Sequence, residues 1–106
     1  MSWYVYILRC AGDTLYTGIT ADLPRRLRQH LGRIPGGAKY TAAHRPERVE
    51  MVWEAPDHPT AARLEWQVKQ LPRLKKERLF REYAQLPAVP RPDLTGLVEN
   101  IAENRP

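Results

Sequence analysis

Two short apolar segments separated by only three residues constrain the fold of this chain more than any other feature. Residues 3–9 read WYVYILR and residues 14–20 read TLYTGIT, and both are rich in β-branched and aromatic side chains, which favour strands. The letters AGD between them are typical of a tight turn. The sequence therefore predicts an antiparallel hairpin over residues 3–20. Because both faces of residues 3–9 are apolar, this segment is predicted to be a central strand.

A helix is predicted directly after the hairpin. Asp22 is a suitable N-cap, Pro24 is tolerated in the first turn, and Gly32 follows the last periodic residue of 23–31. Residues 32–46 are interrupted by Gly and Pro and are too polar and broken for a long element. They are predicted to be a connection.

A third strand and two more helices follow. In residues 47–55, Val49, Met51 and Trp53 alternate with Glu50, Val52 and Glu54, which predicts a strand with the first three side chains on one face. The apolar spacing after Asp57 predicts a helix, and Pro72 separates it from a charged helix over 73–83. The expected fold class is α+β, a three-stranded, mainly antiparallel sheet flanked by helices.

The length of 106 residues fits one domain with a modest core. Residues 1–83 are expected to form that domain, and residues 84–106 a Pro-rich tail that can dock on it. A single cysteine, Cys10, excludes an internal disulfide and a Cys-rich zinc site. No apolar run of about 18 residues is present, and the N-terminus lacks a secretory pattern, so we expect a cytoplasmic protein.

Basic residues are concentrated between residues 20 and 46. This segment holds six basic side chains and one acidic side chain, so its net charge of +5 equals that of the whole chain. The six are Arg25, Arg26, Arg28, Arg33, Lys39 and Arg45. Such a segment either forms a solvated helix face or binds a polyanion, and the charge alone does not decide between them.

Two tyrosines of the hairpin can meet if its turn has the right length. A three-residue loop at 11–13 places Tyr6 opposite Gly18 and makes Tyr6 and Tyr16 diagonal neighbours, roughly 7–8 Å apart on one face. A two-residue loop would place them on opposite faces. The competing interpretation is that both are half-buried packing residues, as strand tyrosines commonly are.

Three more polar side chains are predicted to face the tyrosines. Arg26 and His30 are four residues apart, so they share one face of the first helix. Glu65 lies at the rim of the apolar stripe of the next helix, where its carboxylate can face the sheet. Each has an ordinary alternative: a solvated arginine, a packing or capping histidine, and a glutamate paired with Arg63 or Lys69.

An ordered series of short motifs resembles the GIY-YIG nuclease superfamily, in particular its small bacterial single-domain members. The catalytic domain of the eukaryotic structure-selective endonuclease with this fold is similar as well. The series is YVY (4–6), YTG (16–18), DLPRRLRQH (22–30), AKYT (38–41) and AARLEWQVK (61–69). Tyr4 replaces the usual glycine and Thr17 the usual isoleucine. An asparagine found after the glutamate in many members has no counterpart, since Asn100 and Asn104 lie in the tail.

The resemblance implies one-metal hydrolysis of a phosphodiester. Tyr6 stands at the last tyrosine of the first tripeptide, Tyr16 at the first of the second, Arg26 at the helix arginine, His30 at the polar residue one turn later, and Glu65 at the metal-binding carboxylate. On this basis we expect Glu65 to hold one Mg²⁺ or Mn²⁺ and Tyr6 to act as general base or its relay. Arg26 is expected to bind the scissile phosphate, with Tyr16 and His30 assisting.

The expected function is an endonuclease that acts on branched, flapped or single-stranded DNA in repair or recombination, with RNA as another substrate left open. Further contacts with the nucleic acid are expected from Arg25, Lys39, Tyr40, Lys75 and Lys76. Two alternatives stay open: Tyr40 can equally pack on the sheet, and Lys75 and Lys76 can form a solvated helix face.

Three other functions compete with this one. The first is a nucleic-acid-binding module without activity, and the second is a subunit that is active only with a protein partner. The third is an adaptor that uses the tail or an exposed Trp66. The oligomeric state is left open.

Overall fold

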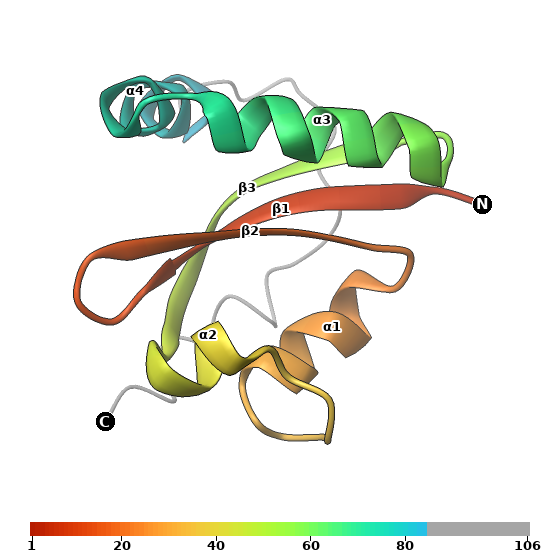
Figure 1. The fold of residues 1–106 in the computed structure, drawn as a ribbon, viewed down its shortest axis with the longest axis vertical. Helices are drawn as coiled ribbons and strands as arrows, with labels where there is room; N and C mark the ends of the chain where they lie inside the picture. Colours follow the sequence, from red (N-terminus) through yellow and green to blue (C-terminus); the bar gives the residue numbers. More distant parts are fainter. Residues whose placement is uncertain (85–106) are drawn as a thin grey trace.

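The computed structural model describes residues 1–84 and has three layers (Figure 1). The middle layer is an antiparallel sheet of β1 (Trp3–Cys10), β2 (Thr14–Thr20) and β3 (Pro46–Ala55), in the order β2-β1-β3. The predicted α+β fold with a three-stranded antiparallel sheet is therefore confirmed, and the central strand is the one predicted. The expected tail at 84–106 lies, after its first residue, outside the described part of the chain.

The hairpin between β1 and β2 has the three-residue loop that the tyrosine prediction requires. Gly12 and Asp13 have φ angles of +79° and +56°, a region that Gly and Asp tolerate better than most residues. Cys10 therefore pairs with Thr14, and the register continues until Tyr6 lies opposite Gly18. Both tyrosines face the same side of the sheet.

Strand β3 departs from the predicted alternation. Met51 lies opposite Ile7, but Val49 lies opposite Leu8, so Glu50 is an extra residue in β3 at this point. One extra residue moves the neighbouring side chains to the other face of a strand. Val49 consequently packs in the cluster that contains Leu8, while Met51 packs with Ile7 on the opposite face. The predicted shared face of Val49, Met51 and Trp53 is wrong for Val49.

Helices α1 (Leu23–His30) and α2 (Lys39–Ala43) cover one face of the sheet (Figure 1). Helix α1 begins as predicted, because the Asp22 carboxylate accepts a hydrogen bond of 3.1 Å from the backbone N–H of Arg25. Leu23 and Leu27 are buried against the side of β1 that carries Tyr6. The short α2 lies inside the predicted connection at 32–46.

Helices α3 (His58–Gln70) and α4 (Arg73–Ala84) cover the other face (Figure 1). Ala61, Val68 and Phe80 are buried there against Val5 and Ile7 of β1. Full burial of each Val, Ile or Phe contributes about 1.5–3 kcal/mol, so the core on this face needs both helices. Among the described residues, no helix has the length and apolar character needed to cross a membrane.

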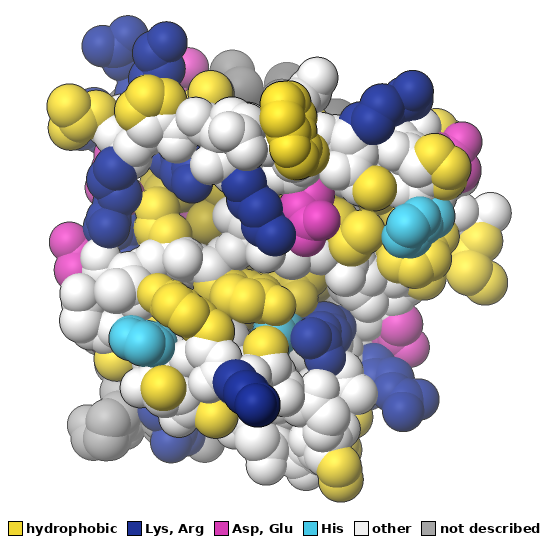
Figure 2. All heavy atoms as spheres, in the orientation of Figure 1, with side chains coloured by type: hydrophobic (Ala, Val, Ile, Leu, Met, Phe, Trp, Pro, Cys, Tyr) yellow, Lys and Arg dark blue, Asp and Glu magenta, His cyan; other side chains and the backbone are white. Residues whose placement is uncertain are grey.

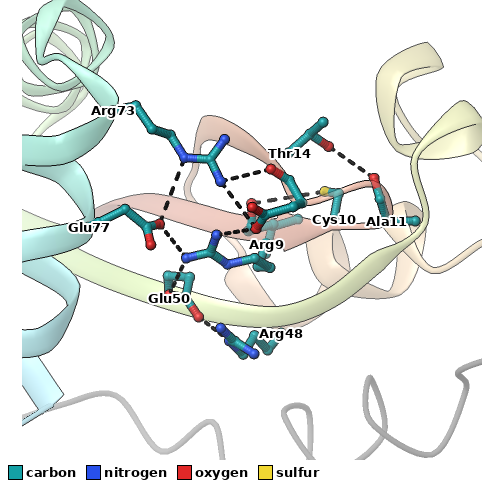
Figure 3. A network of polar contacts seen from close by, with 10 residues as sticks. Arg9, Cys10, Ala11, Thr14, Arg48, Glu50, Arg73 and Glu77 are labelled. Carbon is teal, nitrogen blue, oxygen red and sulfur yellow. Dashed lines mark hydrogen bonds and ion pairs between the residues drawn. The ribbon is translucent and has the colours of Figure 1, made fainter.

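Arg9 of β1 is buried on the α4 side and lies in a cluster of ion pairs (Figure 3). Its guanidinium is 2.7 Å from Asp13 and 3.1 Å from Glu50, and it also pairs with Glu77. Burial lowers the pKa of Arg9, but hydrogen bonds to these three carboxylates outweigh burial and raise the pKa overall.

Two more arginines extend this cluster, which we call the Arg9 cluster (Figure 3). Arg73 of α4 lies 3.2 Å from Asp13 and 3.8 Å from Glu77, and Arg48 pairs with Glu50. The Arg9 cluster thus ties the hairpin turn, the bulge of β3 and helix α4 to one another.

Cys10 is the last residue of β1 and is fully buried in the core between the sheet and α1. Burial, together with the nearby Glu47, raises the pKa of its thiol to about 11. The thiolate is the reactive form of cysteine, so Cys10 is an inert packing residue at neutral pH.

Candidate active site

The phenol of Tyr6 crosses β2 at the one position where β2 has no side chain. Tyr6 is fully buried, and a Cβ atom at residue 18 would lie 2.5 Å from its hydroxyl oxygen and 2.7 Å from Cζ. Any residue other than glycine at position 18 would therefore displace Tyr6. The Tyr16 ring lies beside Tyr6 with a centroid distance of 6.4 Å, so the two predicted neighbours do meet.

His30 connects Tyr6 to helix α2 through a chain of hydrogen bonds. Its Nε2 is 2.6 Å from the Tyr6 hydroxyl, and its Nδ1 is 2.9 Å from Thr41 Oγ1. The Thr41 hydroxyl donates its only hydrogen to the carbonyl of Ala38 at 3.0 Å, so it accepts from Nδ1–H of His30. The neutral imidazole then has a free lone pair on Nε2, and Tyr6 donates its hydroxyl hydrogen to it.

The electrostatic surroundings keep both members of the Tyr6–His30 pair neutral. Burial, helped by the positive charge of Arg26, lowers the pKa of His30 to about 4. Burial and the neighbouring Tyr16 raise the pKa of Tyr6 above its ordinary value, and Arg26 offsets this only in part. At neutral pH the phenol therefore keeps its proton, and the imidazole is able to accept one.

Arg26 is held beside this pair by the loop that follows α1. Its Nη1 donates to Gln29 Oε1 at 3.0 Å and to the carbonyl of Gly36 at 2.7 Å. Gln29 is fixed in turn, since its Nε2 donates to the carbonyl of Pro35 at 3.2 Å. A hydrogen bond between Arg26 and the Tyr6 side chain also lowers the pKa of Tyr6. The guanidinium has five N–H groups in a planar fork, which suits it to binding an anion.

Glu65 approaches the site from the opposite layer, because α3 packs along the edge strand β2. Its negative charge contributes to the raised pKa of Tyr6, which places the carboxylate within electrostatic range of the phenol. Glu65 Oε2 lies 3.5 Å from Lys69 Nζ, the pairing expected as the ordinary alternative. In Figure 2, a band of hydrophobic side chains crosses the centre of this face, with Lys and Arg side chains on both sides of it.

The Glu65 carboxylate is the group of this site that suits a metal ion best, because His30 already uses Nε2 for Tyr6 and Nδ1 for Thr41. Nowhere in residues 1–84 do three or more His, Cys, Asp or Glu side chains form a group able to hold a metal ion. Zinc sites normally use three or four protein ligands, so they do not fit. Mg²⁺ and Mn²⁺ bind through one or two carboxylates plus water and phosphate oxygens, which Glu65 fits.

The sequence profile of the GIY-YIG catalytic domain matches residues 2–78. This chain belongs to the GIY-YIG family. The resemblance predicted from the ordered motifs is thus confirmed, and the family is one of nucleases.

The GIY-YIG chain is similar over most of its length to small bacterial proteins named UPF0213. One from Xanthomonas campestris is 43% identical over 95 residues, which cover 90% of this chain and 91% of that protein. One from Halalkalibacterium halodurans is 44% identical over 79 residues, covering 74% and 82% of the two chains. A solution NMR structure of a UPF0213 protein from Bacillus halodurans is 45% identical and covers 74% of this chain and 82% of its own, with a TM-score of 0.48.

The remaining predicted residues of the GIY-YIG chain lie around this centre. Arg25 and Lys39 are exposed on α1 and α2, the layer that also supplies Arg26 and His30. Lys75 and Lys76 belong to α4 on the other face of the sheet.

Tyr40, which was expected either to contact the nucleic acid or to pack on the sheet, packs against the core with part of its surface. It is half-buried, and its ring stacks on Tyr16 at 5.7 Å and on His44 at 4.4 Å between centroids. It therefore supports Tyr16 from the side of α2.

Sequence reasoning missed the residues that position the GIY-YIG site rather than form it. Thr41 fixes the tautomer of His30, but its position depends on α2, a helix that the sequence did not indicate. Gly37 lets the loop approach α1, since a Cβ there would lie 2.4 Å from the carbonyl oxygen of Gln29. The paired glycines at 36 and 37 were the available signal, because adjacent glycines often mark a close backbone approach.

Proposed function

We propose that this chain is a metal-dependent endonuclease that hydrolyses phosphodiester bonds in DNA. One observation carries the proposal: the neutral His30 offers Nε2 as an acceptor for the hydroxyl hydrogen of Tyr6 at 2.6 Å, next to Arg26 and Glu65. Any buried hydroxyl needs a hydrogen-bond partner, but an imidazole with a free lone pair can also accept the proton of that hydroxyl.

The proton of the attacking water passes to the Tyr6 oxygen while Tyr6 gives its own proton to His30 Nε2. Tyr6 needs this relay because burial raises its pKa and removes phenolate as a ready base. His30 with a pKa of about 4 is a weak acceptor in the free protein. A phosphate bound at Arg26 offsets the positive charge that depresses this pKa, so substrate binding makes His30 more basic.

Arg26, Tyr16 and Glu65 complete the site. The guanidinium of Arg26 binds the scissile phosphate, and the Tyr16 hydroxyl orients the phosphate or the water. Glu65 would hold one Mg²⁺ or Mn²⁺, which supplies positive charge for the developing phosphorane and a template for the leaving oxygen.

The substrate is selected by its structure rather than by its base sequence. Arg25 and Lys39 next to the site contact the DNA backbone, with Lys75 and Lys76 as more distant contacts. Phosphate contacts position the nucleic acid but carry no sequence information. We therefore propose branched, flapped or single-stranded DNA as the substrate and repair or recombination as the setting.

The test is cleavage of labelled flap, splayed-arm, four-way-junction and single-stranded DNA with Mg²⁺, Mn²⁺ or EDTA. The wild type is compared with Glu65→Gln, and Glu82→Gln serves as a control because Glu82 is an exposed carboxylate of α4. Cleavage by the wild type and the control, lost with Glu65→Gln or EDTA, is the expected result. Binding without cleavage of every substrate would contradict the proposal and favour a non-catalytic binding module.

A further inference from the structure

Trp66 of α3 exposes most of its indole next to the candidate site. It is 64% exposed, whereas Trp3 and Trp53 are half-buried against the core between the sheet and helices α3 and α4. Among the described large hydrophobic side chains, only Met1 and Leu74 are exposed to a similar or greater degree. Single exposed apolar side chains are common on protein surfaces, so what distinguishes Trp66 is its position beside Glu65 and among exposed cations.

The geometry of α3 places Trp66 on its outer crest beside Glu65. Leu64 and Val68 face the sheet, and a residue two positions from each lies on the opposite side of a helix. Glu65 lies on the flank between these two sides. Lys69 is three residues after Trp66 and four after Glu65, so it lies between the indole and the carboxylate that it pairs with at 3.5 Å.

Cations surround the indole and continue along α4. Arg63 and Lys69 are exposed one turn before and one turn after Trp66. Lys76 follows on α4, and burial together with the positive charges of Arg73 and Lys69 lowers its pKa, so these three cations lie within electrostatic range of one another. A positive strip therefore starts beside Glu65, passes Trp66 and reaches α4.

We infer that Trp66 is a stacking platform for an unpaired base of the nucleic-acid strand whose phosphate binds at Arg26, with Arg63 and Lys69 binding the flanking phosphates. The inference rests on the proposed nuclease function of that site. Aromatic rings set in a basic groove are the chemistry of single-strand binding, because every unstacked base offers a π face. In a duplex the bases stack on one another, so a fully paired substrate cannot use this platform.

Binding in EDTA tests the inference without any need for cleavage. The probes are a labelled 12-nucleotide thymidine strand and a blunt duplex, titrated with wild type, Trp66→Ala and Trp66→Phe. Leu74→Ala is the matched control, because Leu74 is an apolar side chain of α4 that is 82% exposed. Trp66→Ala is expected to weaken single-strand binding by about 5- to 100-fold and to leave duplex binding within about twofold. Trp66→Phe should keep most of the affinity, and Leu74→Ala all of it.

A strand with one abasic position makes the test sharper. Moving the abasic position along the strand should find one site that weakens binding to the wild type but not to Trp66→Ala. Equal loss on strand and duplex, or no loss on either, would overturn the inference, and the second result would point to a protein partner. Loss of single-strand binding in a protein that never cleaves would leave the platform standing and overturn the nuclease proposal alone.

Discussion

The two faces of strand β1 hold two opposite kinds of buried polar structure. On the side of α1, Tyr6 and His30 form a neutral chain of hydrogen bonds that ends at Thr41. On the side of α4, three residues further along β1, Arg9 is buried among carboxylates in the Arg9 cluster (Figure 3).

The two arrangements differ in whether a proton can move within them. The neutral pair can pass a proton from Tyr6 to His30 because Nε2 has a free lone pair, and a phosphate bound at Arg26 would offset the positive charge that His30 then carries. A buried ion pair cannot lose one partner without a large penalty, because the remaining charge is desolvated. We therefore expect the Tyr6 side to determine activity and the Arg9 side to determine stability.

The largest expected effect comes from Tyr6→Phe. Cleavage should fall by about 10²- to 10⁴-fold, the usual contribution of a positioned acid or base. The free energy of unfolding should fall by only about 1 kcal/mol, the net contribution of one hydrogen bond. Tyr4→Phe is the control, since Tyr4 packs against the same core from the same strand. Comparable loss of cleavage in both variants would show that the Tyr6 hydroxyl has no specific role.

Arg9→Met should have the opposite profile. Removing the guanidinium leaves Glu50, whose side chain is only 10% exposed, with Arg48 alone, so the free energy of unfolding should fall by about 3–4 kcal/mol. Cleavage per folded molecule should not change. Urea unfolding measures the first quantity, and Arg48→Met, a change in a side chain that is 50% exposed, should lower it by less than about 1 kcal/mol.

A double variant tests whether charge is the cause in the Arg9 cluster. Arg9→Met with Glu50→Gln should be more stable than Arg9→Met alone, since the uncompensated carboxylate is gone. A double variant that is less stable would attribute the effect to packing of the arginine side chain.

Stability should fall as the pH is lowered from 7 to 4. The pKa of His30 is about 4 in the folded protein against an ordinary value of 6.5, so the unfolded chain binds more protons between these values. The contribution of neutral His30 to the free energy of unfolding is fully present above about pH 6.5. Up to about 3 kcal/mol of it is lost as the pH falls to 4. Asp13, whose pKa is lowered chiefly by its hydrogen bond to Arg9, adds its loss only at still lower pH.

The His30 contribution can be isolated by subtraction. His30→Gln should unfold with a smaller difference between pH 7 and pH 4.5 than the wild type in urea titrations. An identical pH dependence in the two proteins would mean that His30 is not held neutral by the fold.

The smallest expected effect is that of Thr41→Val. Without an acceptor for Nδ1–H, His30 loses the preference for the tautomer that receives the proton of Tyr6, and cleavage should fall about tenfold, or roughly 1.4 kcal/mol. Thr41→Ser keeps the hydroxyl and should restore activity. The imidazole ¹⁵N chemical shifts report the tautomer directly, and unchanged shifts in Thr41→Val would exclude this positioning role.

Local signals were sufficient for the hairpin and for α1, but not for the β3 bulge. Gly12 and Asp13 suit the left-handed angles of the three-residue turn, and Asp22 caps α1 through a neighbour three residues away. The bulge at Glu50 depends on Arg9, a partner 41 residues away, and no local pattern records such a contact.

The candidate site divides in the same way. The spacing of Tyr6, Tyr16, Arg26 and His30 predicted that these side chains share one region, because strand register and helix period are local properties. The approach of Glu65 from α3 was predicted only as a rim position. The role of Thr41 could not be predicted, because it requires both the short helix α2 and its placement against α1.

The buried position of Cys10 has a practical consequence for labelling. It is the only cysteine of the chain, and its thiol, with a pKa raised to about 11, should resist alkylating reagents in the native state. A cysteine introduced on α3 or α4 would then carry a fluorophore at one defined position without removal of the native thiol. In the unlabelled protein, the rate at which Cys10 reacts measures how often the layer formed by α1 and α2 opens and exposes the thiol.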